Sequence, residues 1–167
     1  MPKVAVLMGS KSDYSIVQPA VESLKHFKID YEIRVISAHR TPDIAREFSL
    51  SAQKNGFEAI ICAAGKAAHL AGVVASYTTL PVIAIPILSS TFSGLDSLLS
   101  CVQMPSGVPV ATVAVNGAEN AAILAAQILS IKYPEIKKMM SVYKEDMRNK
   151  VINDDILLNQ EIKTLKL

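Results

Sequence analysis

Residues 31–42 read YEIRVISAHRTP and place a strand directly before a helix. Apolar and charged side chains alternate over the first half of this stretch, which indicates a strand. Thr41 can cap the helix that follows, and Pro42 suits its first position. We therefore expect His39 and Arg40 at the carboxyl end of a strand, which is where open α/β sheets bind their ligands.

His39 and Arg40 would form a chemically useful pair beside a ligand. Histidine gains and loses a proton near neutral pH, and arginine is a permanent cation that can hold a phosphate group. The alternative is a solvated histidine and a surface arginine in an ordinary loop. This stretch alone does not decide between the two.

Strand-like and helix-like segments alternate five times along the chain. Predicted strands cover Lys3–Met8, Tyr31–Ile36, Ala59–Ala64, Pro81–Ile87 and Val108–Val115. Predicted helices cover Tyr14–Phe27, Pro42–Asn55, His69–Tyr77, Asp96–Val102, Asn120–Ile131 and a last segment from Pro134. Such alternation predicts an α/β fold whose parallel sheet is covered by helices on both faces. We expect a flavodoxin-like three-layer sandwich with a five-stranded parallel sheet and an added C-terminal helix.

No linker, low-complexity segment or repeat interrupts the chain, so residues 1–167 are expected to form a single domain. Its core is assigned to residues 3–131 and a C-terminal helical extension to residues 134–167, helical only in part beyond Val151. An apolar stripe on the last helix is expected to pack on neighbouring subunits. The stripe consists of Ile136, Met139, Met140 and Tyr143.

Charge and composition exclude several classes of protein. The 167 residues include 17 Lys and Arg against 15 Asp and Glu, and this net charge of +2 provides no footprint for nucleic acid. Cys62 and Cys101 lie in apolar surroundings and indicate buried thiols of a reducing compartment. The segment before the first strand lacks the apolar run of a signal peptide, so we expect a cytoplasmic protein. Metal-binding motifs are absent, and no metal is expected.

The middle of the chain is almost free of charge. Between Ala67 and Ala118 the only charged residue is Asp96, with histidine counted as neutral. Prolines and many Ser, Thr and Gly residues break this stretch into short pieces, so we reject a membrane span. We expect it instead to be buried on both faces, against the sheet and against other subunits.

Two further loops follow predicted strands and should open on the same side of the sheet as His39. In residues 9–13, Ser10 and Ser12 can donate to a phosphate and Asp13 can accept from sugar hydroxyls. This loop matches neither a Walker A nor a GxGxxG motif, and its alternative is a simple capping turn.

The loop of residues 65–70 is built of small residues that allow close approach to a ligand. Its His69 either touches the ligand or is a hydrogen-bonded, half-buried side chain. The three loops together lack an activated nucleophile and a pair of carboxylates. They suit a small phosphorylated ligand and proton-transfer chemistry.

Five short motifs occur in order: MGSKSD (8–13), VISAHRTPD (35–43), AAHL (67–70), DSLLS (96–100) and VQMP (102–105). Together they closely resemble the N5-carboxyaminoimidazole ribonucleotide mutase family of purine biosynthesis. The resemblance implies a flavodoxin-like homo-octamer that moves a carboxyl group from an exocyclic nitrogen of an imidazole ribonucleotide to ring carbon four. It also implies a reaction without metal, ATP, biotin or other cofactor.

The same resemblance implies a role for each loop residue. His39 is the residue that moves protons, while carbon dioxide is released and recaptured. Ser10, Asp13 and Arg40 correspond to nucleotide-binding positions. Further residues of the substrate pocket are Ser12, Ser37, Ala38, Gly65 and His69.

Lys66 departs from the family pattern. Many members read Gly-Ala-Gly-Gly-Ala-Ala-His-Leu-Pro where residues 63–71 of this chain read AAGKAAHLA. If the position needs a positive φ, lysine is strained there. Alternatively, the ammonium group meets the carboxylate or the phosphate of the substrate.

Two other functions compete with this interpretation. A related carboxylase class takes free carbon dioxide and the uncarboxylated aminoimidazole ribonucleotide, but its second motif reads Ser-Ala-His-Lys-Gly-Pro, and residues 37–42 here read SAHRTP. The second rival is a non-enzymatic nucleotide-binding or signalling domain on the same fold. A response regulator would need acidic residues after the first and third strands, where this chain has Gly9-Ser10 and Ala63-Ala64.

Overall fold

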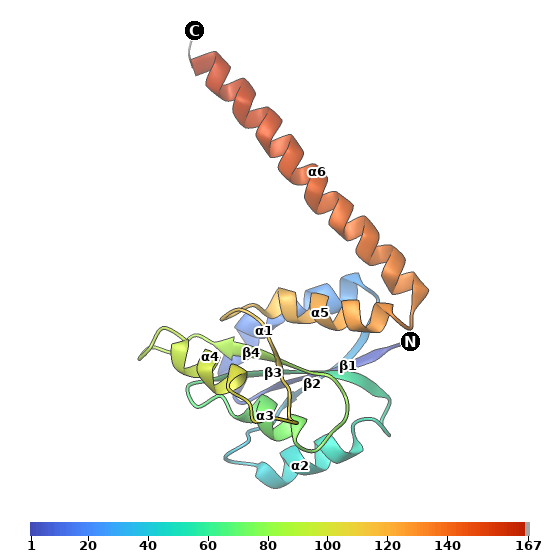
Figure 1. The fold of residues 1–167 in the computed structure, drawn as a ribbon, viewed down its shortest axis with the longest axis vertical. Helices are drawn as coiled ribbons and strands as arrows, with labels where there is room; N and C mark the ends of the chain where they lie inside the picture. Colours follow the sequence, from blue (N-terminus) through green and yellow to red (C-terminus); the bar gives the residue numbers. More distant parts are fainter. Residues whose placement is uncertain (166–167) are drawn as a thin grey trace.

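The computed structural model describes residues 1–165 and contains a five-stranded, all-parallel sheet in the order β2-β1-β3-β4-β5 (Figure 1). The strands are β1 (Lys3–Met8), β2 (Asp30–Val35), β3 (Phe57–Gly65), β4 (Val82–Ile87) and β5 (Ala111–Thr112). The helices are α1 (Tyr14–His26), α2 (Pro42–Ser51), α3 (Leu70–Ala75), α4 (Leu95–Val102), α5 (Ala118–Ser130) and α6 (Pro134–Leu165), with a 3-10 turn at Lys11–Asp13. This order confirms the predicted flavodoxin-like sandwich.

The sheet separates two halves of the hydrophobic core because successive side chains of a strand point to opposite faces. On β1, Val4 and Val6 pack with helices α1, α5 and the start of α6. Ala5 and Leu7 pack with α2, α3 and Cys101 of α4. Figure 1 shows α1 and α5 on one side of the strands and α2 and α3 on the other. Burial on both faces explains the near-continuous apolar strands.

The fifth strand is shorter than predicted: only Ala111–Thr112 of the expected Val108–Val115 pairs with β4. Pro86 of β4 turns its carbonyl toward this edge, where it accepts from the backbone N–H of Asn116. Pro86 has no backbone N–H to donate toward β5, so the ladder of hydrogen bonds between β4 and β5 stops there.

Helix α2 begins at Pro42, as predicted, but it ends at Ser51 and not at the predicted Asn55. Thr41 occupies the N-cap position and Pro42 the first turn, yet the Thr41 hydroxyl makes no capping bond. It turns back to the preceding loop, as described below.

Helix α6 is continuous to Leu165, so the segment beyond Val151 is helical throughout the described residues, which is more than the partial helicity expected. Residues 166 and 167 of the predicted extension lie outside them. The expectation that the apolar stripe packs on other subunits fails for its first turns. Ile136 is 1% exposed and Met140 6%, and both belong to the core of their own chain. Periodicity marks a buried face of a helix without specifying which chain covers it.

The turn between α5 and α6 is fastened to β3 through Glu58. Its carboxylate accepts hydrogen bonds from the Tyr133 hydroxyl, at 2.5 Å, and from Lys132 Nζ, at 2.9 Å. Burial raises the pKa of Glu58, but these two hydrogen bonds, together with the positive charges of Lys132 and the N-terminus, outweigh it and leave the pKa below its usual value of 4.5. The first turns of α6 are thereby held against the domain.

The charge-poor stretch forms α3, β4, α4 and β5. No helix within residues 1–165 has both the length and the apolar character needed to cross a membrane. Cys62 and Cys101 are free and buried, as predicted, and burial raises the pKa of the Cys101 thiol to about 11.

Candidate functional site

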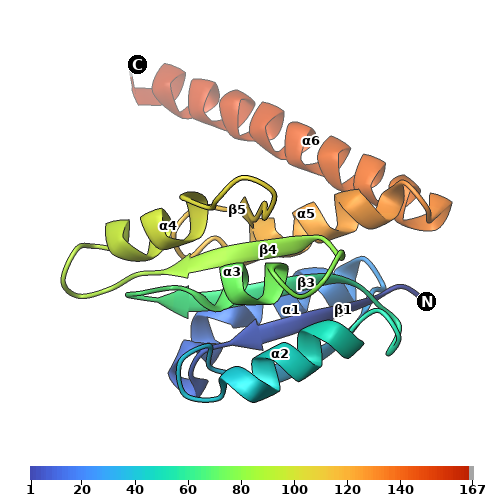
Figure 2. The same cartoon turned by 60° about the horizontal axis from the view of Figure 1, so that its bottom comes forward.

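A cavity of about 620 Å³ opens at the carboxyl ends of β1, β2, β3 and β4. The arrows of β1, β3 and β4 in Figure 2 point toward this end of the sheet. All the residues that the sequence singled out line it: Ser10, Ser12, Asp13, Ser37, Ala38, His39, Arg40, Gly65, Lys66 and His69. Three loops far apart in sequence therefore meet at one place, as expected for a parallel sheet.

The loop after β1 presents a cluster of hydroxyls to the cavity. Ser10 Oγ accepts from the Ser12 backbone N–H at 3.3 Å and lies 2.8 Å from Ser12 Oγ. Ser10 is thus the cap of the 3-10 turn, and Asp13 occupies the N-cap position of α1. The Asp13 side chain makes no capping bond; its Oδ1 accepts from Ser12 Oγ at 3.3 Å, and the residue lines the cavity.

The loop after β2 is closed by a reciprocal pair of hydrogen bonds. Thr41 Oγ1 accepts from the Ser37 N–H and donates to the Ser37 carbonyl, each at 3.0 Å. The Ser37 hydroxyl accepts from Arg40 Nε at 3.3 Å, and Arg40 Nη2 donates to the Gly9 carbonyl at 2.8 Å. The guanidinium therefore bridges the first two loops and keeps further N–H donors free for an anion.

His39 and His69 form a hydrogen-bonded pair. Their Nε2 and Nδ1 atoms lie 2.8 Å apart, and the rings meet edge to face with centroids 4.9 Å apart. One nitrogen must donate and the other accept, so the tautomers of the two rings are linked. His69 is therefore hydrogen-bonded, as one of the two alternatives expected, but it is exposed and not half-buried, and it lines the cavity.

The turn after β3 is tightly constrained. A Cβ on Gly65 would lie 3.3 Å from Cβ of Ile87, so glycine permits the close contact with β4. The next residue, Lys66, has a φ of 57°. A left-handed conformation costs an L-residue roughly 1–2 kcal/mol. The strain considered for Lys66 from the sequence is therefore present.

A fourth loop, which was not predicted from the sequence, also lines the cavity. Leu88, Ser89 and Ser90 follow β4 and line the cavity with Ile87. Ser89 Oγ donates to Asp96 Oδ1 at 2.7 Å, which ties the loop to α4 and gives a role to the only charge of the middle stretch. The rule that ligands bind beyond the carboxyl ends of strands could have identified this loop from the end of β4.

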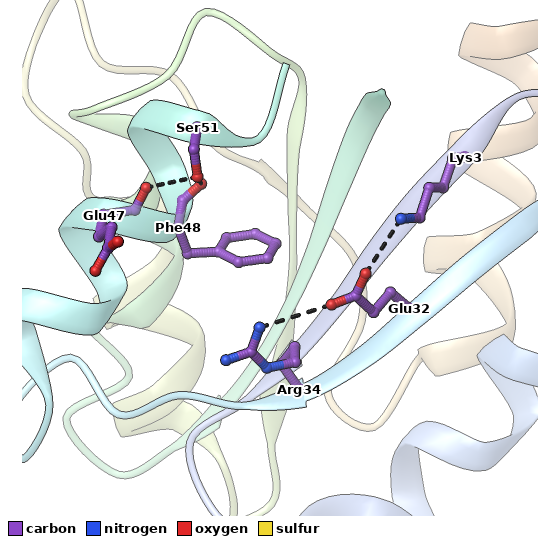
Figure 3. Close-up of polar contacts among 6 residues, drawn as sticks. All are labelled: Lys3, Glu32, Arg34, Glu47, Phe48 and Ser51. Atoms are coloured by element: carbon purple, nitrogen blue, oxygen red, sulfur yellow. Dashed lines mark hydrogen bonds and ion pairs between the residues drawn. The ribbon is translucent and has the colours of Figure 1, made fainter. Parts of the chain in front are cut away.

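A second hollow of about 500 Å³ lies at the other end of β1, beside the last turns of α2 (Figure 3). Its two cations both pair with Glu32, and Glu47 adds a second carboxylate to the lining. Lys3 Nζ lies 3.1 Å from one oxygen of Glu32, and Arg34 Nη1 lies 3.6 Å from the other. The Lys3 ammonium also sits 4.2 Å from the ring centroid of Phe57. This surface is a less suitable anion site than the cavity at the strand ends.

Within residues 1–165, no three His, Cys, Asp or Glu side chains gather closely enough to hold a metal ion. The cavity instead offers hydroxyls, a fixed guanidinium, a free lysine, one carboxylate and a histidine pair. This set can bind an anion, contact sugar hydroxyls and move a proton.

Comparison with known proteins covers nearly the whole chain. The sequence model of a family described as AIR carboxylase matches residues 3–150. An N5-carboxyaminoimidazole ribonucleotide mutase from Saccharolobus solfataricus is 60% identical, over 92% of this chain and 97% of that protein. A protein of the same name from Thermotoga maritima is 56% identical, over 96% and 94%. The crystal structure of Treponema denticola PurE has a TM-score of 0.83 at 35% identity and covers 93% of this chain and 97% of that one.

Proposed function

We propose that this chain, which belongs to the AIR carboxylase family, moves the carboxyl group of 5-(carboxyamino)imidazole ribonucleotide from the exocyclic nitrogen to ring carbon four. It is a mutase of purine biosynthesis and hence an isomerase. The observation that carries the proposal is the single cavity that brings a histidine pair beside a bridged arginine and two serine hydroxyls.

The substrate would lie across the loops. Ser10, Ser12 and Arg40 supply hydroxyl and guanidinium donors for the phosphate, and Asp13 accepts from the ribose hydroxyls. The imidazole then lies toward the histidine pair. Ser37, Ala38, Gly65 and the fourth loop line the remainder of the cavity.

His39 would move protons in both halves of the reaction. Cleavage of the nitrogen–carbon bond releases carbon dioxide, and the nitrogen takes a proton from His39. Carbon four then attacks the carbon dioxide, and its hydrogen leaves as a proton to the same imidazole. No proton is gained or lost overall, so one group can serve both steps.

His69 would hold the ring of His39. Its Nδ1 lies 2.8 Å from His39 Nε2, so it can donate to or accept from that nitrogen as the charge on His39 changes. This contact supports a positioning role for His69 beside the catalytic role of His39.

An assay with both candidate substrates tests the proposed function. The purified enzyme should convert the N-carboxylated ribonucleotide in buffer free of bicarbonate. Turnover of only the uncarboxylated ribonucleotide, and only with added bicarbonate, would instead identify the enzyme as the carboxylase considered above.

We also propose a homo-octamer, supported by the face of α6 that begins with Ile136 and Met140. At about 3.6 residues per turn, Met147, Val151 and Leu158 continue the same face. Val151 is 67% exposed and Leu158 55%, and Figure 1 shows this part of the helix extending away from the domain. A second copy can cover this face.

Light scattering tests the assembly. Leu158→Glu should reduce the mass in solution, whereas Gln160→Glu, a matched change on the opposite face, should leave it unchanged. A parent protein that is a stable monomer at micromolar concentration would contradict the octamer.

A cytoplasmic location is also proposed, since the free buried cysteines suit a reducing compartment.

A further inference from the structure

We propose that Lys66 recognises the carboxylate that is transferred, and so distinguishes carboxylated from uncarboxylated ribonucleotides. This inference rests on the proposed function and names the substrate group that meets the lysine. Lys66 lines the cavity, and no other residue within 1–165 forms a hydrogen bond or an ion pair with its ammonium group. The charge is therefore available to a ligand.

The backbone at this position is set by its surroundings. Gly65 packs against Ile87 of β4, and the chain then turns at Lys66 with a φ of 57°. Glycine would adopt this φ without strain, but this chain places a long cationic side chain here. Strained backbone conformations cluster at ligand-binding sites, so the strain at Lys66 fits a side chain whose charge stabilises a bound ligand.

The substrate carries two anionic groups, and within residues 1–165 the cavity is lined by two cationic side chains, those of Arg40 and Lys66. Arg40 is held by the Gly9 carbonyl and lies with the serine hydroxyls of the first loop. This arrangement assigns the phosphate to Arg40, because a guanidinium and nearby hydroxyls suit its several oxygens.

The remaining cation shares a loop with His69, which contacts His39 at 2.8 Å. Carbon dioxide leaves the exocyclic nitrogen and joins ring carbon four where protons are exchanged, which is at the histidine pair. The carboxylate is therefore assigned to the part of the cavity that the loop of Lys66 and His69 lines. An ammonium group suits it because the carboxylate occupies two positions during the reaction, and a flexible point charge can follow both.

Calorimetric titration of two probes onto three variants tests this assignment. The probes are the C-carboxylated product ribonucleotide and the uncarboxylated aminoimidazole ribonucleotide, which share the ribose phosphate. Lys66→Met removes the charge and keeps a long side chain at the strained position, while Lys66→Arg keeps the charge. Lys11→Met is the matched control, since Lys11 lies in the 3-10 turn outside the cavity lining.

Lys66→Met should weaken binding of the carboxylated probe about tenfold or more and change binding of the uncarboxylated probe less than about twofold. Lys66→Arg should retain most of the affinity, and Lys11→Met all of it. Equal losses for both probes would place the ammonium on the phosphate and overturn the inference, as would unchanged affinities. If the parent protein binds neither probe, the proposed function itself fails.

Discussion

Replacement of Arg40 by alanine removes the only guanidinium among residues 1–165 that lines the cavity. In the folded protein this group donates to the Gly9 carbonyl at 2.8 Å and to Ser37 Oγ at 3.3 Å, so it is already oriented before the ligand arrives. A hydrogen bond to a charged group contributes about 1.5–3 kcal/mol. Arg40 is exposed, so we assign it one such contribution, which corresponds to about 10-fold to 150-fold weaker binding of the ribonucleotide.

The affinity is measured by calorimetry with the parent protein, Arg40→Ala and Arg40→Lys. Lysine should restore only part of the loss, because an ammonium cannot reproduce a two-pronged contact with phosphate. Arg46→Ala is the matched control, since Arg46 lies on α2 near the ring of Tyr77 and outside the cavity lining. Equal affinities of Arg40→Ala and the parent would remove Arg40 from the phosphate site and refute this reasoning.

Two further predictions concern stability. Gly94→Ala and Gly107→Ala both place alanine at a positive φ, at 85° and 91°, but only at Gly94 would the new Cβ meet a neighbour, Val115 Cγ1 at 2.7 Å. Thermal melting should show a loss of about 1–2 kcal/mol for Gly107→Ala and a larger loss for Gly94→Ala; equal losses would show that packing at Gly94 relaxes freely. Tyr133→Phe should destabilise the fold at neutral pH, and the gap from the parent should narrow as the pH falls below 4.5, because the pKa of Glu58 is lowered and its contribution disappears when it is protonated. Denaturant unfolding at several pH values measures this gap, and a gap independent of pH would exclude the carboxylate as its source.

The residues of the site could be found from the sequence because the rule that locates them is simple. All strands of a parallel sheet have their carboxyl ends at the same edge. Ser10, His39 and Lys66 each follow a predicted strand, so their proximity could be predicted without knowing the order of the strands in the sheet. The same rule explains why the fold class was predictable, since alternating buried strands and amphipathic helices allow few other arrangements.

Contacts that depend on side-chain placement could not be predicted. His39 and His69 are 30 positions apart. They follow β2 and β3, which lie on either side of β1, so their hydrogen bond spans the end of the strand between them. The early end of β5 depends on Pro86, a neighbour in space on another strand. The stripe of α6 has one continuous periodicity, although Ile136 is buried in its own chain and Val151 is exposed.

The central claim is that His39 carries the proton in both halves of the carboxyl transfer. Single-turnover rates of His39→Asn and His69→Asn, measured with ribonucleotide binding in parallel, test it most directly. Asparagine can form a hydrogen bond but cannot transfer the proton, so His39→Asn should bind the ribonucleotide and lose about a hundredfold to ten-thousandfold in rate, toward the upper end. His69→Asn should cost less, because it alters only the partner of the catalytic ring. Near-parental turnover of His39→Asn, or a greater loss in His69→Asn, would contradict the mechanism.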